Sequence, residues 1–278
     1  MKMIDGKLVR NIRKEKLIEK VNKLNDKLTL VDVNVGDNEA SKIYIKQKEK
    51  MALSIGYNFI NLHFDSISEE DLINEIVKLN NDPKITGIIV QLPLPDYLNK
   101  DNILNAISPL KDVDGLTNTN LMKLINKEKC LLPCTPKGVI SLLDYYNIDL
   151  QQNVVIVGRS KLVGYPLFNM LLNRNATITI CHSKTKNLGD ITKNADILIV
   201  AVGKKGLITK DMIKENVIII DVGINRDNDK IYGDVDINCF DKALMMTPVP
   251  GGVGPMTVIS LMENVYEAYI EGLENGTR

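Results

Sequence analysis

Short apolar runs alternate with longer amphipathic stretches along most of this chain. Apolar runs bounded by turn formers predict buried strands, and apolar residues spaced three and four apart predict helices. In the first part of the chain the pattern predicts strands over 29–36, 57–64 and 86–95. It predicts helices over 8–28 and 100–107, a helix that begins at Asn38 or Ser41 and ends at about 55, and a helix that begins after an N-cap at Ser68. The stretch SPLKDVDGLTNTN (108–120) is too polar and too rich in turn formers for a regular element.

The alternation starts again near Pro136. It predicts helices over 138–147, 163–173 and 256–273, and strands over 154–158, 176–181, 195–203 and 216–223. Short apolar strands that alternate with helices favour a parallel sheet covered on both faces. The sequence therefore predicts an α/β protein of two units joined around 116–136, with a last helix that could pack back on the first unit.

Composition adds little beyond excluding some classes of protein. The 278 residues suit one large or two modest domains, and Lys+Arg and Asp+Glu balance at 35 each, so a nucleic-acid or membrane surface is not expected. The apolar runs are too short for a bilayer, and the N-terminus is charged throughout. The four cysteines show no CxxC spacing, so we expect no metal site and a cytoplasmic protein.

The segment VVIVGRSKLVGYP (154–166) is a strand that breaks into a turn and then a helix. Dinucleotide folds place a pyrophosphate at such a turn, against backbone N–H groups. The usual GxGxxG is absent, since Gly158 is followed by Arg159 and Ser160 and the next glycine is Gly164. Many such turns hold no ligand, but the surrounding strand–helix–strand pattern favours nucleotide binding.

The end of the following strand discriminates between cofactors. It reads CHSKT (181–185), without the carboxylate that would accept from an NAD ribose, while Arg159 and Lys161 come from the preceding turn. A guanidinium and hydroxyl donors suit a 2′-phosphate, so NADP is favoured over NAD. Taken singly, Lys161 and Lys184 are equally explained as solvated charge.

Candidate catalytic chemistry lies in the first unit. Tyr44 and Lys48 are four residues apart and share a helix face. A YxxxK pair is typical of short-chain dehydrogenases, but there it follows the nucleotide motif within one domain, whereas here it precedes that motif by more than a hundred residues. An exposed lysine beside a half-buried tyrosine also explains the spacing. Gln91 ends a buried strand at the edge where α/β sheets bind ligands, and KDVDG (111–115) supplies carboxylates or an Asx-type turn.

The glycines and prolines of TPVPGGVGPMT (247–257) precede the last predicted helix. Proline fixes the backbone, and glycine lets another molecule approach it. One explanation is a rigid turn with Pro255 at the first helical position. The other is a ligand-binding backbone.

Together these stretches resemble one family, the bifunctional methylenetetrahydrofolate dehydrogenase/methenyltetrahydrofolate cyclohydrolases. The resemblance covers essentially the whole chain in family order, through VGDNEASKIYIKQK (35–48), IVQLPLP (89–95), KDVDG (111–115), PCTPKG (133–138), VGRSKLVGYP (157–166), CHSKT (181–185), IDVGIN (220–225), GDVD (233–236) and TPVPGGVGPMT (247–257). QLPLP and PGGVGPMT are its most specific motifs. One departure is Met122, at a position that the family usually keeps small, which raises a question about local loop packing.

The resemblance implies a folate-binding catalytic domain over 1–118, completed by 256–278, and a Rossmann-like NADP domain over 136–250. TPVPGGVGPMT would cross between them where the pterin meets the nicotinamide. The enzyme would oxidise 5,10-methylenetetrahydrofolate with NADP⁺, a hydride transfer that needs positioning rather than an acid or base, and then hydrolyse the methenyl cation to 10-formyltetrahydrofolate.

The resemblance also implies the site residues. Lys48 would transfer protons in the hydrolysis, because a cationic substrate and partial burial favour its neutral amine. Gln91 would hold that amine in place. Tyr44 would stack on the pterin or order the lysine, and Asp114 would bind the amino-pyrimidine edge of the pterin. Substrate would also contact Leu92, Pro250 and Gly254. The cofactor would contact Gly158, Arg159, Ser160, Ser183, Ala201, Gly203, Ile224 and Thr257.

Two alternatives stay open at this point. A dehydrogenase that has lost the cyclohydrolase step is disfavoured by the intact set Tyr44, Lys48, Gln91 and Asp114. A non-catalytic nucleotide sensor would leave that set without a purpose. A homodimer is expected only because α/β enzymes of this size are often symmetric dimers.

Overall fold

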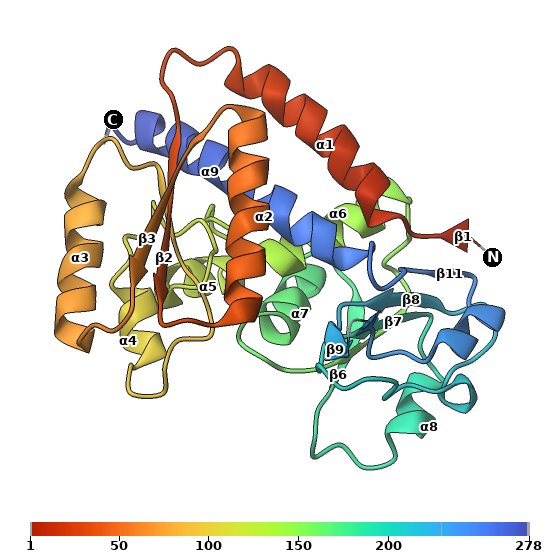
Figure 1. The fold of residues 1–278 in the computed structure, drawn as a ribbon. Coiled ribbons are helices and arrows are strands. Elements are labelled where there is room, and N and C mark those ends of the chain that lie inside the picture. The colour runs from red at the N-terminus through yellow and green to blue at the C-terminus, as the bar shows by residue number, and fades with distance from the viewer. Residues whose placement is uncertain (1, 229, 277–278) are drawn as a thin grey trace. The chain divides into compact units, whose positions relative to one another are not determined.

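A computed structural model describes residues 2–228 and 230–276, which fold into two compact units (Figure 1). The three-stranded unit comprises Arg13–Cys134 and the chain from Val258 onward, and the six-stranded unit comprises residues 2–12 and Thr135–Thr257. We expected the N-terminus in the first unit. Instead β1 (Lys2–Met3) pairs in parallel with β11 (Met245–Met246) and so joins the second sheet.

The three-stranded unit is built on a parallel sheet in the order β3-β2-β4. Its strands are β2 (Thr29–Val35), β3 (Asn58–Phe64) and β4 (Gly87–Val90), and its helices are α2 (Glu39–Ile55), α3 (Glu69–Asn81), α4 (Lys100–Asn105), α5 (Asn118–Ile125) and most of α1 (Gly6–Val21) and α9 (Val253–Glu274). The predicted caps are confirmed, since Asn38 accepts from Ser41 N and Ser68 from Asp71 N.

All seven residues of the central strand β2 are buried, so its two faces meet different neighbours. Side chains alternate along a strand. Val31, Val33 and Val35 pack with apolar residues of α3 and α4, including Leu72 and Ile103. The intervening side chains therefore turn to the opposite face, toward α2, and Figure 1 shows α2 and α3 on opposite sides of this sheet.

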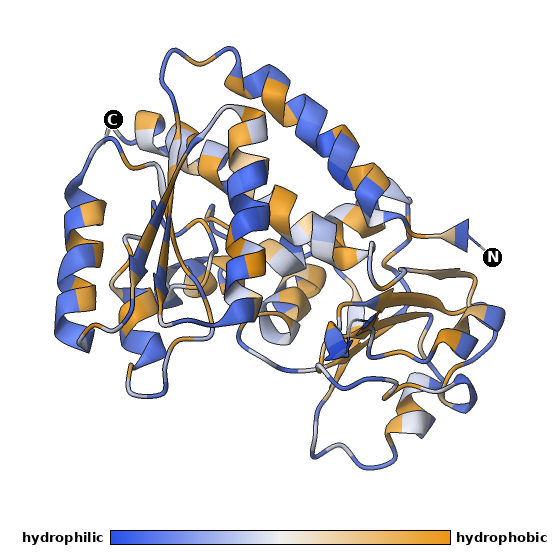
Figure 2. Ribbon diagram, in the orientation of Figure 1, coloured by the Kyte–Doolittle hydropathy of each residue, from blue (hydrophilic) through white to orange (hydrophobic). Residues whose placement is uncertain are grey.

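The six-stranded unit has an all-parallel sheet in the order β1-β11-β8-β7-β5-β6. Its other strands are β5 (Asn153–Val157), β6 (Thr177–Cys181), β7 (Ile197–Val200) and β8 (Ile218–Asp221), with an antiparallel pair β9 (Asn225–Asp227) and β10 (Lys230–Tyr232). Its helices are α6 (Cys134–Tyr145), α7 (Gly164–Leu172) and α8 (Leu188–Thr192), with 3-10 turns η1 (Lys210–Met212) and η2 (Ile237–Asp241). Figure 2 shows the apolar strands that form the core of this sheet.

The structure differs from the sequence-based expectation in short elements. The stretch expected to be irregular gives way to α5 at Asn118, because Thr117 caps the helix by accepting from Asn120 N. Pro255 is the third residue of α9 and not the first. Met122 lies 57 % exposed on α5, so its size creates no packing conflict. Among the described residues no helix is long and apolar enough to cross a membrane.

Candidate active site

Lys48 lies in the middle of the buried stripe of α2. That stripe consists of Ser41, Ile45, Lys48, Ala52 and Ile55, the spacing of a helix face packed on a sheet. Only 6 % of Lys48 is exposed. A lysine at such a position needs polar partners, because an unpaired buried charge is costly.

Gln91 supplies the first partner. Its amide Oε1 accepts from Lys48 Nζ at 2.6 Å, while its Nε2 donates to the carbonyl of Leu92, which fixes the orientation of the amide. The register explains the meeting. β4 pairs Ile89 with Asp32 of β2, and Gln91, two residues after Ile89, points to the same face of the sheet.

Asp32 supplies the second partner, and sequence reasoning missed it. Its Oδ2 lies 2.5 Å from Lys48 Nζ, and its side chain is fully buried. Neither carboxylate oxygen has a hydrogen bond of ordinary geometry with the other described residues, so the contact with Lys48 is an ion pair. Burial raises the pKa of Asp32, and the charge of Lys48 opposes that rise. The available signal was an acid inside the apolar strand TLVDVNV.

The two acids of KDVDG, Asp112 and Asp114, have different environments in the structure. Asp112 is buried and accepts from Leu116 N, Thr117 N and Asn120 Nδ2, so it builds the Asx-type turn before α5. Asp114 is half-buried. Burial, with a smaller contribution from the negative charge of Asp112, raises the pKa of Asp114 to about 6, against the opposing effect of Lys48. Asp114 is the carboxylate whose environment fits a ligand-binding role.

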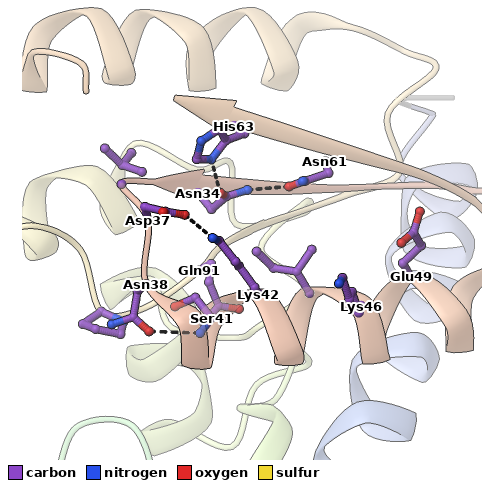
Figure 3. A pocket seen from close by; sticks show the side chains of 14 residues that line it. Asn34, Asp37, Asn38, Ser41, Lys42, Lys46, Glu49, Asn61, His63 and Gln91 are labelled. Carbon is purple, nitrogen blue, oxygen red and sulfur yellow. Dashed lines mark hydrogen bonds and ion pairs between the residues drawn. The ribbon is translucent and has the colours of Figure 1, made fainter. Parts of the chain in front are cut away.

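Tyr44 and Leu92 are half-buried in the same unit, Tyr44 one turn before Lys48 on α2. A pocket of about 330 Å³ opens nearby (Figure 3). Gln91, Ser41 and Ile45 contribute to its lining, but Lys48 and Tyr44 do not. Asn34 and His63 also line it, and His63 Nδ1 lies 2.6 Å from Asn34 Oδ1.

The predicted nucleotide residues come together along the carboxyl edge of the six-stranded sheet. After β5 the chain adds β6 on one side and then β7 on the other, and ligands of α/β sheets bind outside the strand ends at such a reversal. The strand order β8-β7-β5-β6 places the segments that follow these four strands next to one another. In that order the segments carry Ile224 after β8, Ala201 and Gly203 after β7, Gly158, Arg159 and Ser160 after β5, and Ser183 after β6.

The turn after β5 has the shape of a phosphate cradle. Gly158 has a φ of 128°, and a Cβ there would lie 2.3 Å from the carbonyl oxygen of Ala201. A Cβ on Gly164 would lie 2.1 Å from the carbonyl oxygen of Gly158. The first turn of α7 has no side-chain cap, so its N–H groups suit an anion. Arg159, Ser160 and Ser183 are exposed beside this turn.

The strand ends also present exposed apolar side chains, Val202 at 46 % and Ile224 at 42 %. Exposed apolar side chains at a ligand edge suit the face of an aromatic ring. The backbone N–H groups of the turn after Gly158, the guanidinium of Arg159 and the apolar side chains of Val202 and Ile224 together suit a dinucleotide. Ile224 was among the predicted cofactor residues, and Val202 was not.

Two buried acids hold the loops of this edge in place. Asp221 accepts from the backbone N–H groups of Gly223, Asp234 and Val235. Asp234 accepts from Val202 N, Gly203 N, Lys204 N and Asn225 Nδ2. Burial raises the pKa of Asp221 to about 6 in spite of its backbone hydrogen bonds. The motifs IDVGIN and GDVD contain these two acids, but the structural role of the acids was not evident from the sequence.

The remaining predicted residues belong to the six-stranded unit. Pro250 is exposed, and Gly254 is half-buried near the Ile224 side chain, with 3.8 Å between its ideal Cβ position and Ile224 Cδ1. Thr257 Oγ1 lies 3.0 Å from Thr135 Oγ1. The structure thus brings the predicted cofactor residues to one unit, and Tyr44, Lys48, Gln91, Leu92 and Asp114 to the other.

The fold and these two sites define a two-unit α/β enzyme that binds a dinucleotide in one unit and holds a buried lysine with acids in the other. Residues 4–114 match the family model "Tetrahydrofolate dehydrogenase/cyclohydrolase, catalytic domain", and residues 133–272 match its "NAD(P)-binding domain". The chain belongs to the tetrahydrofolate dehydrogenase/cyclohydrolase family.

Individual relatives agree over nearly the full length. A bifunctional FolD protein of Lactobacillus johnsonii is 47% identical over 94% of this chain and 95% of its own. The crystal structure of the bifunctional enzyme FolD from Campylobacter jejuni superposes with a TM-score of 0.94 at 44% identity, over 96% of this chain and 98% of its own. The Trypanosoma brucei enzyme, solved with NADP cofactor and an inhibitor, gives a TM-score of 0.91 at 32% identity, over 98% of both chains.

Proposed function

We propose that Lys48, Gln91 and Asp114 carry the folate chemistry of this chain, and that Arg159 and the turn around Gly158 select its cofactor. The chain is a bifunctional enzyme of one-carbon metabolism. It oxidises 5,10-methylenetetrahydrofolate with NADP⁺ and hydrolyses the resulting 5,10-methenyltetrahydrofolate to 10-formyltetrahydrofolate. The observation that carries the residue assignment is the buried Lys48 amine, 2.6 Å from Gln91 Oε1.

In the oxidation, NADP⁺ supplies the nicotinamide C4 that accepts the hydride. The chain's part is positioning, because the folate nitrogens stabilise the cation that forms. The N–H groups at the start of α7 would hold the pyrophosphate, the Arg159 guanidinium would pair with the 2′-phosphate, and the Ser160 and Ser183 hydroxyls would donate hydrogen bonds to that phosphate. Val202 and Ile224 offer apolar contact to a ring.

In the hydrolysis, Lys48 acts twice. Its neutral amine takes a proton from water as the oxygen bonds to the methenyl carbon and the C=N electron pair returns to nitrogen. Its ammonium form then gives that proton to N5 as the C–N5 bond breaks. The remaining hydroxyl loses its proton to solvent and becomes the formyl C=O, so one proton is released per turnover.

Asp114 and Tyr44 hold the pterin. With its pKa raised to about 6, Asp114 is ionised at neutral pH and can accept two parallel hydrogen bonds from the amino-pyrimidine edge. Tyr44 is half-buried beside Lys48 and supplies a ring face for stacking. Leu92 adds apolar contact next to the oriented Gln91 amide. In the six-stranded unit, Pro250 and Gly254 are further candidates for substrate contact, and Thr257 is a candidate for cofactor contact.

An absorbance assay with 5,10-methylenetetrahydrofolate tests the assignment. It is run separately with NADP⁺ and NAD⁺, and acid quenching then distinguishes methenyl from 10-formyl product. NADP⁺-dependent turnover that ends in 10-formyl product is expected. Turnover that stops at the methenyl product would favour a dehydrogenase without the second activity and would demote Lys48 to a structural residue.

We also propose that the chain is a cytoplasmic homodimer. The four cysteines all lie among the described residues and form no disulfide there, and three of them are buried, as expected in a reducing compartment. Symmetric dimers are common among α/β enzymes of this size. Light scattering coupled to size-exclusion chromatography would give twice the 31.1 kDa chain mass for a dimer. A mass of one chain at micromolar concentration would contradict it.

A further inference from the structure

The proposed chemistry gives no purpose to the buried charge of Asp32. Asp32 lies on the central strand β2, fully buried, with its carboxylate 2.5 Å from the amine of Lys48. The rest of that strand is apolar apart from Thr29 and Asn34. A buried ion pair gives little net stability compared with apolar residues of the same volume, so stability alone gives no reason for an acid at this position.

Geometry suggests a reason. A neutral lysine amine has two N–H donors and one lone pair. Gln91 Oε1 lies 2.6 Å from Nζ and Asp32 Oδ2 lies 2.5 Å from it, so the amine faces two acceptors. One N–H group is held by the hydrogen bond to Gln91, and the negative charge of Asp32 attracts the N–H side of the amine from a second direction, which favours a lone pair that points in a third. With Gln91 alone, rotation about the terminal carbon–nitrogen bond would swing the lone pair away from an attacking water.

Charge supports the same reading. Three carboxylates act on this region, Asp32 from β2 and Asp112 and Asp114 from the loop before α5, and Lys48 of α2 is the cation that opposes them. Asp112 is occupied with Leu116 N, Thr117 N and Asn120 Nδ2. Asp114 is assigned to the pterin. Asp32 is the carboxylate that meets the amine directly, and it stabilises the ammonium that Lys48 becomes on accepting a proton.

We propose that Asp32 is a positioning residue for the hydrolytic step, acting through Lys48. With Gln91 it aims the lone pair of the neutral amine, and it holds the ammonium in place until the proton passes to N5. The inference rests on the proposed role of Lys48. The oxidation needs no protein acid or base, so Asp32 should matter for one of the two activities only.

The test is Asp32→Asn, which keeps the volume and an acceptor oxygen but removes the charge. Asp32→Val is the second variant, because a β-branched apolar residue suits a buried strand. Thr29→Val is the matched control, since Thr29 is a buried polar residue at the start of the same strand, where its Oγ1 accepts from Asn58 Nδ2 instead. Hydrolysis is followed directly from 5,10-methenyltetrahydrofolate, and oxidation with NADP⁺.

For Asp32→Asn we expect kcat of hydrolysis to fall at least about tenfold, within the range of general acid–base contributions. The pH midpoint of its rate profile should move down by about one unit, because the ammonium has lost its anion. Oxidation and the KM for folate should stay within about twofold, and Thr29→Val should keep both activities. Asp32→Val, which removes the acceptor as well, should lose more of the hydrolysis.

A folded Asp32→Asn with unchanged hydrolysis and an unchanged pH profile would overturn the inference, as would an equal fall in both activities. If Asp32→Asn does not fold, the ratio of hydrolysis rate to oxidation rate is measured for Asp32→Val instead, and an unchanged ratio would overturn the inference. A wild-type chain that does not hydrolyse 5,10-methenyltetrahydrofolate would instead overturn the proposed role of Lys48. The two failures are therefore distinguishable.

Discussion

Asp32 of the three-stranded unit and the two acids Asp221 and Asp234 of the six-stranded unit are buried in opposite ways. In the six-stranded unit, Asp221 and Asp234 are surrounded by backbone N–H donors, three for each. In the three-stranded unit, Asp32 has the ammonium of Lys48 and no hydrogen bond of ordinary geometry with the other described residues. All three side chains are essentially inaccessible to solvent.

The difference separates structural acids from acids near chemistry. A carboxylate whose lone pairs are filled by backbone amides fixes the loops that donate to it and has no capacity left for a substrate. A carboxylate paired with one lysine can respond when that lysine gains or loses a proton. Burial alone would not have distinguished the two kinds, but the identity of the donors does.

The largest effect on activity that would test this difference between the two kinds of buried acid is expected at Lys48. Lys48→Met should reduce hydrolysis of 5,10-methenyltetrahydrofolate by about 10³-fold, while oxidation keeps much of its rate, because only the hydrolysis transfers protons to the chain. Steady-state assays of both reactions provide the measurement. Lys46→Met is the control, because Lys46 is exposed on the same helix. An equal fall in both activities with intact folate binding would show that the assigned role is wrong.

The next effect concerns the structural acids. Asp234→Ala would leave three backbone N–H groups and the Asn225 amide without their acceptor, so we expect a loss of about 3 kcal/mol in the free energy of unfolding. Denaturant unfolding measures it. Asp236→Ala is the control, since Asp236 caps only the short η2 turn. Comparable losses for both variants would remove the special role given to Asp234.

A smaller, selective effect is expected at the cofactor turn. Arg159→Ala should raise the KM for NADP⁺ about tenfold, the size of one lost charge-assisted contact, and leave the KM for folate nearly unchanged. Initial-rate kinetics with each substrate varied in turn would show this. Lys161→Ala, two residues further along the same exposed turn, is the comparison. If the KM for NADP⁺ did not change, Arg159 would not belong to the phosphate site.

The smallest effect is a pH dependence of stability at Asp114. Native Asp114 keeps its proton up to pH about 6, whereas a free aspartate releases it near 3.8, so unfolding releases a proton between these values and stability falls as pH rises through them. The Asp114→Asn variant has no carboxyl group at this position, so its stability does not fall with pH for this reason. Its melting temperature relative to wild type should therefore rise by a few degrees from pH 4 to pH 7. A difference that is flat with pH would contradict the burial argument.

Much of the fold could be predicted from the sequence, because local patterns carry it. The apolar runs of β2, β5, β7 and β8 are short and bounded by turn formers, and the helices between them have an apolar stripe and recognisable caps. Lys48 and Gln91 were found for the same reason, since their spacing and position at a strand end are local features. Motifs in family order then supplied the reaction.

Only the tertiary structure determined which polar groups meet. Asp32 and Lys48 are sixteen residues apart, and their contact depends on which face of β2 turns to α2. The pairing of β1 with β11 joins segments more than two hundred residues apart. Asp221 and Asp234 acquire their donors from loops after different strands. Sequence periodicity specifies which side of an element is buried, but the partner across the interface is set by packing and register, which no local pattern encodes.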